Sequence, residues 1–244
     1  MPRLSLIVIT KNEEANIRRC LASVPFADEI VVVDSASTDR TVEIARALGA
    51  KVLQPEDWPG FGPQKQRALD HASGEWILSL DADEWIGPEL AEEIRTVIAD
   101  PESADAWRMP RRNRFCGEIV RHGGWWPDHV LRLFRKSKAR FSEDRVHESV
   151  IADGAFSTLK NPIEHDTIVS LEDAREKAAR YGAIAARQLA ERGRQGSAAK
   201  AALRAAAAYL RAFVFRLGFV EGRLGHRVAR YQAAYTYKKW SGAA

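Results

Sequence analysis

Short, almost unbroken apolar runs alternate with amphipathic segments over the first hundred residues. Continuous apolar runs of this length are typical of parallel strands that are buried on both faces, and they predict strands at 4–10, 29–34, 51–54 and 76–81. Apolar residues at helical spacing lie between them and predict helices at about 12–23, 42–48 and 64–72. This alternation favours right-handed βαβ units and an α/β fold with a mostly parallel sheet flanked by helices.

The pattern changes near residue 100. Further strands are predicted at 106–112, 130–134 and 163–166, with loops rich in Arg, Trp, Gly and His between them. From residue 171 the sequence is rich in alanine and lacks proline, which favours helices, and glycines at 193–196 and 218 divide it into about three. We therefore expect an α/β domain at 1–170 followed by a helical C-terminal region at 171–244.

The formal net charge of +4 combines two regions of opposite sign. Residues 171–244 contain 15 Lys and Arg against 5 Asp and Glu, a net charge of +10, and residues 1–170 contain 22 against 28, a net charge of −6. Such an asymmetry indicates that the basic region meets an anionic partner, such as nucleic acid, a membrane surface or an anionic acceptor.

A helix over residues 198–217 would be amphipathic. Lys200, Arg204 and Arg211 fall on one stripe, and five apolar side chains lie broadly opposite: Leu203, Leu210, Phe213, Val214 and Leu217. A basic amphipathic helix can lie on an anionic membrane. The alternatives are that its apolar face packs on the α/β domain or on a second subunit.

The cysteine content and the lack of long apolar segments limit the protein class. The only cysteines are Cys20 and Cys116, so neither a disulfide framework nor a cysteine-based zinc site is expected, and a reducing cytoplasm is the predicted location. No run of about 20 apolar residues occurs, which argues against a membrane-spanning helix. Residues 1–5 do not resemble a signal peptide.

Polar residues follow three of the predicted parallel strands, where open α/β sheets bind their ligands. They are the segments TKNEE at 10–14, DSASTD at 34–39 and DADE at 81–84. Asp81 and Asp83 present hard oxygen ligands of the kind that Mg²⁺ or Mn²⁺ prefers. Each segment also has a structural explanation. Asp39 is a candidate helix N-cap, Glu13 and Glu14 suit a first helical turn, and the Asp pair suits a solvated turn.

Three blocks of this sequence resemble inverting family 2 glycosyltransferases of the GT-A fold. They are SLIVITKNEEANIRRCLASV at 5–24, EIVVVDSASTDRTVEIA at 29–45 and GPQKQRALDHASGEWILSLDADE at 62–84. The blocks stand in the family's order and at its usual spacing, and the resemblance covers residues 4–100. It implies a Rossmann-like GT-A catalytic domain at 1–170, with a nucleotide-sugar half at 1–100 and an acceptor half at 101–170.

The resemblance also implies roles for individual residues. The residues expected to line the nucleotide pocket are Thr10, Asn12, Glu13, Asp34, Lys65 and Asp81. Among these, Asp34 would bind the uracil-type base, and Asp81 would contact ribose or the metal ion. Asp83 would be the main ligand of a Mg²⁺ or Mn²⁺ ion, with Asp81 and His165 as further candidates. Lys65 is alternatively an ordinary surface cation of its helix, and His165 a structural hydrogen-bonding residue.

The second half resembles bacterial enzymes that add a glucose to the lipopolysaccharide inner core. The matching segments are VLRLFRK at 130–136, FSEDRVHES at 141–149, IEHD at 163–166 and the C-terminal segment 219–237. An inverting transfer needs a general base for the acceptor hydroxyl. Ser142-Glu143-Asp144 corresponds to a Thr-Glu-Asp element of many family members, and residues 146–148 match the Val-His-Glu of the core subgroup. Glu148 is therefore favoured over Asp144 as the base.

These observations lead to one leading hypothesis. The protein would transfer a single sugar, glucose, from a UDP-sugar to a lipopolysaccharide core acceptor with the help of Mg²⁺ or Mn²⁺. It would act in the cytoplasm, with peripheral contact at the inner face of the inner membrane through its basic helices and no nucleic-acid partner. The alternatives are a single-sugar transferase for another glycan or a protein, and a catalytically inactive membrane-surface binding module. A nicotinamide dehydrogenase is disfavoured because no Gly-x-Gly-x-x-Gly follows the first strand.

Overall fold

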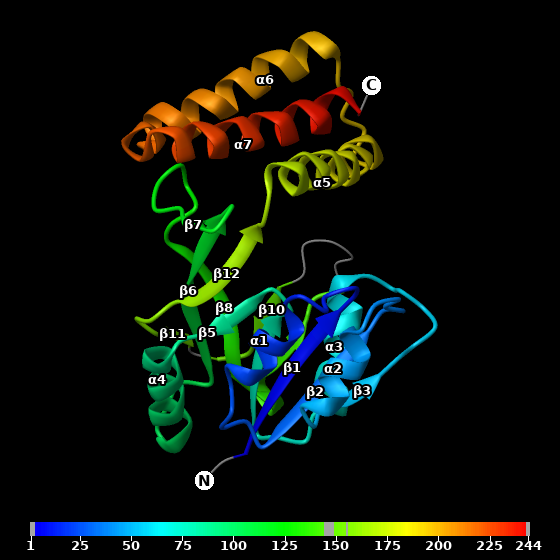
Figure 1. Cartoon of the computed structure of the whole chain (residues 1–244), viewed down its shortest axis with the longest axis vertical. Helices are drawn as coiled ribbons and strands as arrows, with labels where there is room; N and C mark the ends of the chain where they lie inside the picture. Colours follow the sequence, from blue (N-terminus) through cyan, green and yellow to red (C-terminus); the bar gives the residue numbers. More distant parts are fainter. Residues whose placement is uncertain (1–2, 144–148, 155, 243–244) are drawn as a thin grey trace. The chain divides into compact units, whose positions relative to one another are not determined.

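The computed structural model describes residues 3–143, 149–154 and 156–242 (Figure 1). The chain forms two compact units. The first comprises Met1–Arg111 and His129–His165, and the second comprises Arg112–Asp128 and Asp166–Ala244. The second unit therefore includes a segment from the middle of the chain in addition to the helical region expected at 171–244. The functional division at residue 170 stays a prediction.

Four parallel strands form one side of the main sheet, in the order β3-β2-β1-β4. They are β1 Leu4–Thr10, β2 Glu29–Asp34, β3 Lys51–Leu53 and β4 Trp76–Asp81. The helices that connect them are α1 Ile17–Ala22, α2 Thr41–Ala47 and α3 Phe61–His71. The α/β architecture predicted from the apolar runs is confirmed, although α1 begins five residues later than the expected start of the first helix.

The sheet continues past β4 with β8, β6, β12 and β5, and β8 runs antiparallel to β4. The bounds of this part are β5 Glu84–Ile86, α4 Pro88–Ala99, β6 Ala106–Phe115, β8 Asp128–Arg135 and β12 Ile163–Ile168. Two short strands, β7 Glu118–Ile119 and β11 Phe156–Thr158, pair with β6. A 3₁₀ turn at Lys136–Lys138 leads to a separate antiparallel hairpin of β9 Ala139–Phe141 and β10 Val150–Ala152. The sheet is thus mixed and mostly parallel on its N-terminal side.

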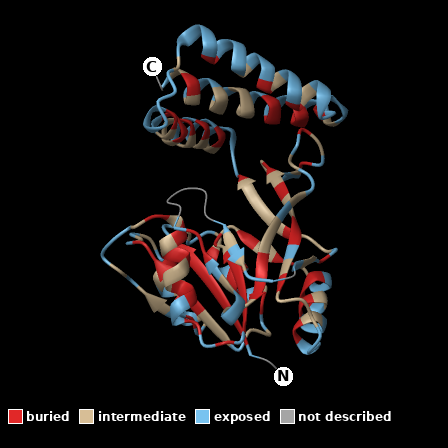
Figure 2. Cartoon of the chain, turned by 180° about the vertical axis from the view of Figure 1, so that it is seen from behind, coloured by how far each residue is buried: buried red, intermediate tan, exposed pale blue. Residues whose placement is uncertain are grey.

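The central strand β1 holds the core of the first unit together because it is buried on both faces. Leu6 and Val8 face the same cluster as Ile17 of α1, whereas Ile7 and Ile9 face the cluster that contains Leu69 of α3. This is the alternation that a strand imposes on its side chains. Figure 2 shows the central strands as the most continuously buried part of this unit.

Three long helices make up most of the second unit: α5 Leu171–Glu191, α6 Ala198–Leu210 and α7 Arg223–Ser241. Ser170 and Ser197 cap α5 and α6 by accepting hydrogen bonds from Asp173 N and Lys200 N. A π-helical turn at Arg211–Phe215 and a 3₁₀ turn at Gly218–Glu221 join α6 to α7. The prediction of three C-terminal helices is confirmed.

Small residues allow α6 and α7 to pack closely. Ala201, Ala208 and Ala212 are buried, and a Cβ atom on Gly225 would lie 1.7 Å from the carbonyl oxygen of Gly218. Tyr209 of α6 also packs against His226 of α7, whereas Leu203 and Leu210 of α6 are exposed. In the parts of the chain that the structure describes, no helix is both long and apolar enough to cross a bilayer.

Candidate active site

The carboxyl ends of β1, β2 and β4 meet at one edge of the sheet. The register pairs Thr10 with Asp34 and Ile9 with Asp81, so the predicted polar residues lie on neighbouring strands. Asp34 is fully buried and accepts hydrogen bonds from the backbone N–H and the hydroxyl of Ser37, at 3.0 and 2.5 Å. The Thr10 hydroxyl is buried and has no hydrogen-bond partner among the described residues. This edge therefore presents one fixed carboxylate and one hydroxyl whose hydrogen-bonding capacity remains unused.

Asn12 and Glu13 belong to the loop between β1 and α1; Asn12 binds the loop that follows β2, and Glu13 binds the first residue of α2. The backbone N–H of Asn12 donates to Ser37 Oγ at 2.7 Å, and Thr38 N donates to Asn12 Oδ1 at 2.8 Å. Glu13 N donates to Thr41 Oγ1 at 2.7 Å. Asn12 adopts a φ of 55°, which Asn tolerates better than most residues. This non-helical conformation keeps Asn12 outside α1, which explains why the helix starts later than the sequence predicts.

Lys65 reaches the end of β4 from helix α3. Its side chain is 2% exposed, and its Nζ lies 2.7 Å from Asp81 Oδ1. The preceding residue, Gln64, is fully buried and donates to Ser35 Oγ at 3.0 Å. This bond fixes α3 against the residue that follows β2. Lys65 lies on the same helix and is therefore held in a buried position, where it pairs with Asp81. The alternative interpretation of Lys65 as an ordinary surface cation is wrong.

Arg132 of β8 approaches Asp81 from the other side. Its Nη2 donates to Asp81 Oδ2 and, at 2.9 Å, to Glu84 Oε1. Burial raises the pKa of the Asp81 carboxyl, but Arg132 and then Lys65 outweigh that effect and hold its pKa well below the ordinary value. Burial would lower the pKa of Arg132, yet Asp81 and Glu84 raise it above its usual range. Both groups are therefore charged across the physiological pH range.

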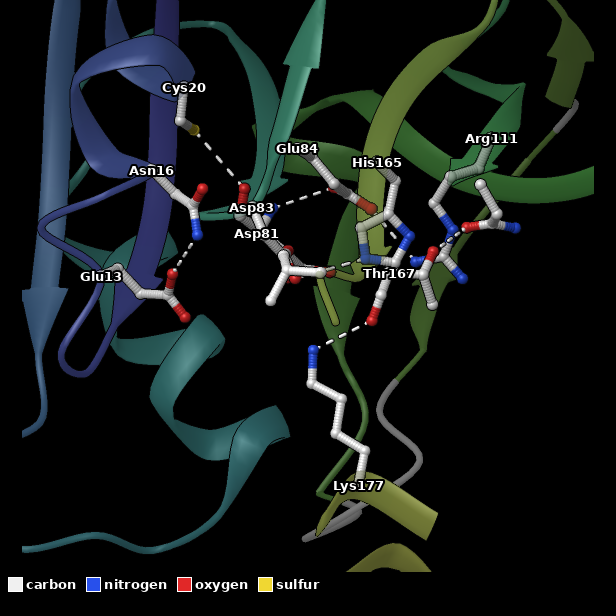
Figure 3. A network of polar contacts seen from close by, with 12 residues as sticks. Glu13, Asn16, Cys20, Asp81, Asp83, Glu84, Arg111, His165, Thr167 and Lys177 are labelled. Carbon is white, nitrogen blue, oxygen red and sulfur yellow. Dashed lines mark hydrogen bonds and ion pairs between the residues drawn. The ribbon is translucent and has the colours of Figure 1, made fainter. Parts of the chain in front are cut away.

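Glu84 closes the DADE segment at the end of β4, but no role of its own was predicted for it from the sequence. It is fully buried and accepts hydrogen bonds from the Asp81 backbone N–H at 2.9 Å and from Arg111 Nη1 at 3.1 Å, in addition to Arg132 (Figure 3). Glu84 thus anchors the turn that presents Asp81 and Asp83. Two features of the sequence could have pointed to Glu84. It is a carboxylate directly after the Asp-x-Asp element, and each of two predicted strands contains an arginine that could pair with it.

Asp83, in the turn between β4 and β5, lies beside His165 of β12. Asp83 Oδ2 is 3.4 Å from His165 Nε2, and the register pairs His165 with Glu84 (Figure 3). Asp81 instead pairs with Lys65 and Arg132. Of the three candidate metal ligands, Asp83 and His165 therefore contact each other, and Asp81 has separate partners. Within residues 3–143, 149–154 and 156–242, no group of three or more His, Cys, Asp or Glu side chains is placed to share a metal ion. The assignment of these residues to a metal site stays a prediction.

The two candidate bases, Asp144 and Glu148, lie outside the described residues. The chain on either side of them is described. Ser142 N donates to the carbonyl oxygen of Ser149 at 2.9 Å, and Ser149 N donates to Ser142 Oγ at 3.1 Å. These bonds continue the β9–β10 hairpin by one residue pair. The assignment of a general base stays a prediction.

A cavity of about 320 Å³ opens beside Asp81. Its lining comes from α3, β4, β6, β8 and the β9–β10 hairpin: Lys65, Asp81, Arg111, His129, Val130, Leu131, Arg132, Phe141, Ser149 and Val150. Lys65, Arg111 and Arg132 line the cavity with Asp81, and Glu84 behind the lining pairs with both arginines, so three cations meet two carboxylates here. Such a lining suits an anionic ligand, and phosphate oxygens are the natural acceptors for lysine and arginine donors.

The fold and the polar strand ends define a glycosyltransferase of the GT-A class. Residues 1–349 of TarS from S. aureus match this structure with a TM-score of 0.51 at 21% identity, over 73% of this chain and 65% of that chain. Residues 5–164 match Glycosyl transferase family 2. The chain belongs to this family.

Two relatives match over most of their length. An uncharacterised glycosyltransferase of Rickettsia typhi is 32% identical over 91% of this chain and 80% of its own length. The lipopolysaccharide core biosynthesis glycosyltransferase LpsC of Rhizobium meliloti is 29% identical over 97% of this chain and 92% of its own length. The expected fold and enzyme class are thus confirmed.

Proposed function

We propose that this enzyme transfers a single glucose from a UDP-sugar to a lipopolysaccharide core acceptor with inversion at the anomeric carbon. One observation carries the choice of acceptor. The similarity to LpsC extends over 97% of this chain, so it includes the acceptor half and the C-terminal helices as well as the nucleotide half. The lysine and two arginines that line the cavity beside Asp81 support an anionic donor such as a nucleoside diphosphate sugar.

The donor nucleotide would bind at the ends of β1 and β2. Asp34 is buried at the end of β2, and a carboxylate there can accept the N–H of a uracil-type base. The unpartnered Thr10 hydroxyl beside it supplies a further hydrogen-bonding group. Asn12 and Glu13 would shape this edge, because their hydrogen bonds tie the β1–α1 loop to the β2–α2 loop and to the start of α2. Lys65 and Asp81 would lie where the ribose and diphosphate enter the cavity.

Asp83 and His165 would hold the Mg²⁺ or Mn²⁺ ion. A carboxylate oxygen and an imidazole nitrogen are both accepted metal ligands, and their separation of 3.4 Å is compatible with a shared partner. Asp81 would contribute only after releasing a cation, since Lys65 and Arg132 occupy its two oxygens. The ion would supply positive charge to the diphosphate as it leaves.

The transfer itself would be a single displacement. The acceptor hydroxyl oxygen forms a bond to the anomeric carbon while the bond from that carbon to the diphosphate oxygen breaks, and UDP leaves with the electron pair. A carboxylate takes the hydroxyl proton, and Glu148 is the first candidate with Asp144 as the second. Their flanking residues support this choice, because Ser149 and Val150 line the cavity. One sugar per encounter is expected because the Gln-x-x-Arg-Trp element of processive family members is absent.

A panel of sugar nucleotides with Mn²⁺ or Mg²⁺ tests the donor assignment. UDP-glucose should release UDP slowly in the absence of an acceptor, and Asp83→Ala should reduce this release about 100-fold or more. The exposed Asp100→Ala is the matched control and should leave the rate unchanged. Release that survives Asp83→Ala, or no release from any donor, would contradict a metal-assisted transferase.

The assignments of the acceptor and of the general base can be tested only in the complete transfer reaction. Mass spectrometry of lipopolysaccharide from a strain that lacks the protein should show a core shortened by one hexose. Glu148→Gln should abolish transfer to that shortened core, and Asp144→Asn should leave part of it. If only the Asp144 substitution abolishes transfer, the order of the two candidates is wrong. An unaltered core would point to a different glycan or protein acceptor.

A further inference from the structure

The connection between α6 and α7 exposes an unusual number of large apolar side chains. We call residues 211–223 the hairpin tip. Five of its side chains are at least 45% exposed: Val214 at 45%, Phe215 at 79%, Leu217 at 50%, Phe219 at 51% and Val220 at 59%. Isolated exposed apolar residues are normal, but five within seven positions form a patch that needs an explanation.

The backbone of the hairpin tip has a defined structure that directs these side chains outward. A π-helical turn, a left-handed residue at Leu217 and a 3₁₀ turn follow each other. Gly218 packs against the preceding turn so closely that a Cβ atom there would lie 2.7 Å from the Ala212 carbonyl oxygen. Phe213 packs against Tyr209 and His226, and small residues make the close backbone contacts, so the five exposed apolar residues of the tip are left outside these contacts.

The tip is also fastened to another part of the second unit. Gly123 N donates to the carbonyl oxygen of Arg216 at 2.9 Å, and Arg121 N donates to Glu221 Oε1 at 2.6 Å. His122 Nδ1 lies 3.0 Å from the same Glu221 oxygen. These bonds hold the tip in one conformation, so the exposure of its apolar residues is a feature of the folded unit.

Three arginines belong to the hairpin tip together with the apolar residues. Arg211, Arg216 and Arg223 are exposed, and none of them forms an ion pair within the described parts of the chain. The sequence contains no Asp or Glu between Glu191 and Glu221. The one acidic residue of the tip, Glu221, is bound by the 121–122 segment. The patch thus combines apolar side chains with uncompensated positive charge.

We propose that the hairpin tip inserts its apolar side chains into the surface of a membrane that contains anionic lipids. Apolar residues at the depth of the headgroups, with arginines that bind the lipid phosphates around them, are the arrangement that holds a peripheral protein on such a surface. A second copy of the chain fits the patch less well. A two-fold interface would bring the same three arginines against one another without a carboxylate between them.

Vesicle flotation of the full chain tests this proposal. The protein should float with phosphatidylcholine vesicles that contain about 30% phosphatidylglycerol and should stay at the bottom with pure phosphatidylcholine. Replacing the apolar residues together, as Phe215→Ser with Phe219→Ser and Val220→Ser, should weaken binding at least ten-fold. Arg211→Gln with Arg223→Gln should weaken it by about five-fold for each arginine, and added salt should have a similar effect.

Matched controls separate the tip from the general charge of the region. Arg187→Gln with Arg194→Gln removes the same charge elsewhere in the second unit, and Val169→Ser with Leu171→Ser removes exposed apolar residues at the start of α5. Both double variants should float like the wild type. UDP release from the donor should be unchanged in the tip variants, so a failure of the tip is distinguishable from a failure of the enzyme.

Three results would overturn the proposal. Unchanged flotation of the apolar variant would show that the tip is not the contact. Equal binding to neutral and anionic vesicles would exclude the role of the arginines. An absence of binding to both kinds of vesicle would mean that the tip is covered in another way, and sedimentation would then show whether a second copy covers it.

Discussion

The buried cluster around Asp81 and the hairpin tip both contain arginines, but they place them in opposite environments. Arg132 is 6% exposed and has two carboxylate partners, Asp81 and Glu84. Arg211 and Arg223 of the tip are exposed and have no carboxylate partner in the described structure. Positive charge that is paired inside the protein fixes geometry, whereas unpaired charge at the surface is available to bind something else. The comparison can be tested by removing a charge from each region.

The largest effect is expected for Glu84→Gln. Glu84 is fully buried and accepts hydrogen bonds from Arg132 and Arg111, so the substitution leaves buried positive charge without its partner. The free energy of unfolding should fall by about 3–5 kcal/mol, measured by urea denaturation. The exposed Glu102→Gln is the control and should change it by less than about 0.5 kcal/mol. A change at Glu84 as small as the control would show that the cluster does not fix the fold.

A smaller effect with a distinct pH dependence is expected for Asp81→Asn. Because the folded-state pKa of Asp81 is depressed, its contribution to stability is present above the unfolded pKa of about 3.9 and is lost as the pH falls through the lower folded value. The variant should therefore be less stable than the wild type from pH 7 to pH 5. The difference should shrink below about pH 4, as followed by denaturation at each pH.

A difference between the two proteins that stays constant down to pH 2 would contradict this prediction. It would mean that Asp81 stabilises the fold through something other than its charge. Asp70→Asn removes an exposed carboxylate whose side-chain partner among the described residues is Gln66 on the same helix, and it should show no such pH dependence.

The smallest effect on stability is expected at the hairpin tip. Arg211→Gln with Arg223→Gln should change the free energy of unfolding by less than about 0.5 kcal/mol, because exposed arginines without partners contribute little to the folded state. Thermal denaturation with and without anionic vesicles sharpens the contrast. Vesicles should raise the melting temperature of the wild type and raise that of the double variant less. A clear loss of stability without lipid would show that these arginines support the fold.

Much of the fold could be predicted because each buried parallel strand corresponds to a run of consecutive, mainly apolar residues in the sequence. The runs at 4–10, 29–34 and 76–81 are apolar at nearly every position, and the strands observed have the same bounds. The polar residues at their ends then follow from the parallel arrangement. The late start of α1 was not predictable from the apolar spacing, because it depends on Asn12 and its bonds to a loop 25 residues away.

The site could be predicted only where its residues lie at strand ends. Lys65 and Asp81 were both expected near the nucleotide, but their pairing depends on how α3 packs against the sheet. The role of Glu84 depends on the antiparallel pairing of β4 with β8, which brings Arg132 beside it from a position 48 residues further along the chain. Contacts of this kind are set by tertiary structure and leave no local pattern in the sequence.

In the C-terminal helices, too, the sequence predicted the helices but not which of their residues pack together. The helical pattern was clear, and the apolar stripe with Leu203 and Leu210 was the expected packing or membrane face. The alanines were considered only as strong helix formers. In the structure Ala201 and Ala208 are buried, whereas Leu203 and Leu210 are 74% and 50% exposed. Close packing of helices favours small side chains over large ones, which hydrophobicity alone does not reveal.

The bonds of Asn12 have a consequence for how this enzyme can be recombined with its relatives. The β1–α1 loop and the β2–α2 loop exchange hydrogen bonds through Asn12, Ser37 and Thr38, and Glu13 adds a bond to Thr41. A chimera that takes one loop from another family member keeps these bonds only if that loop carries matching residues at the bonded positions. The two loops therefore form one exchangeable module, and crossovers between relatives should be placed before β1 and after α2.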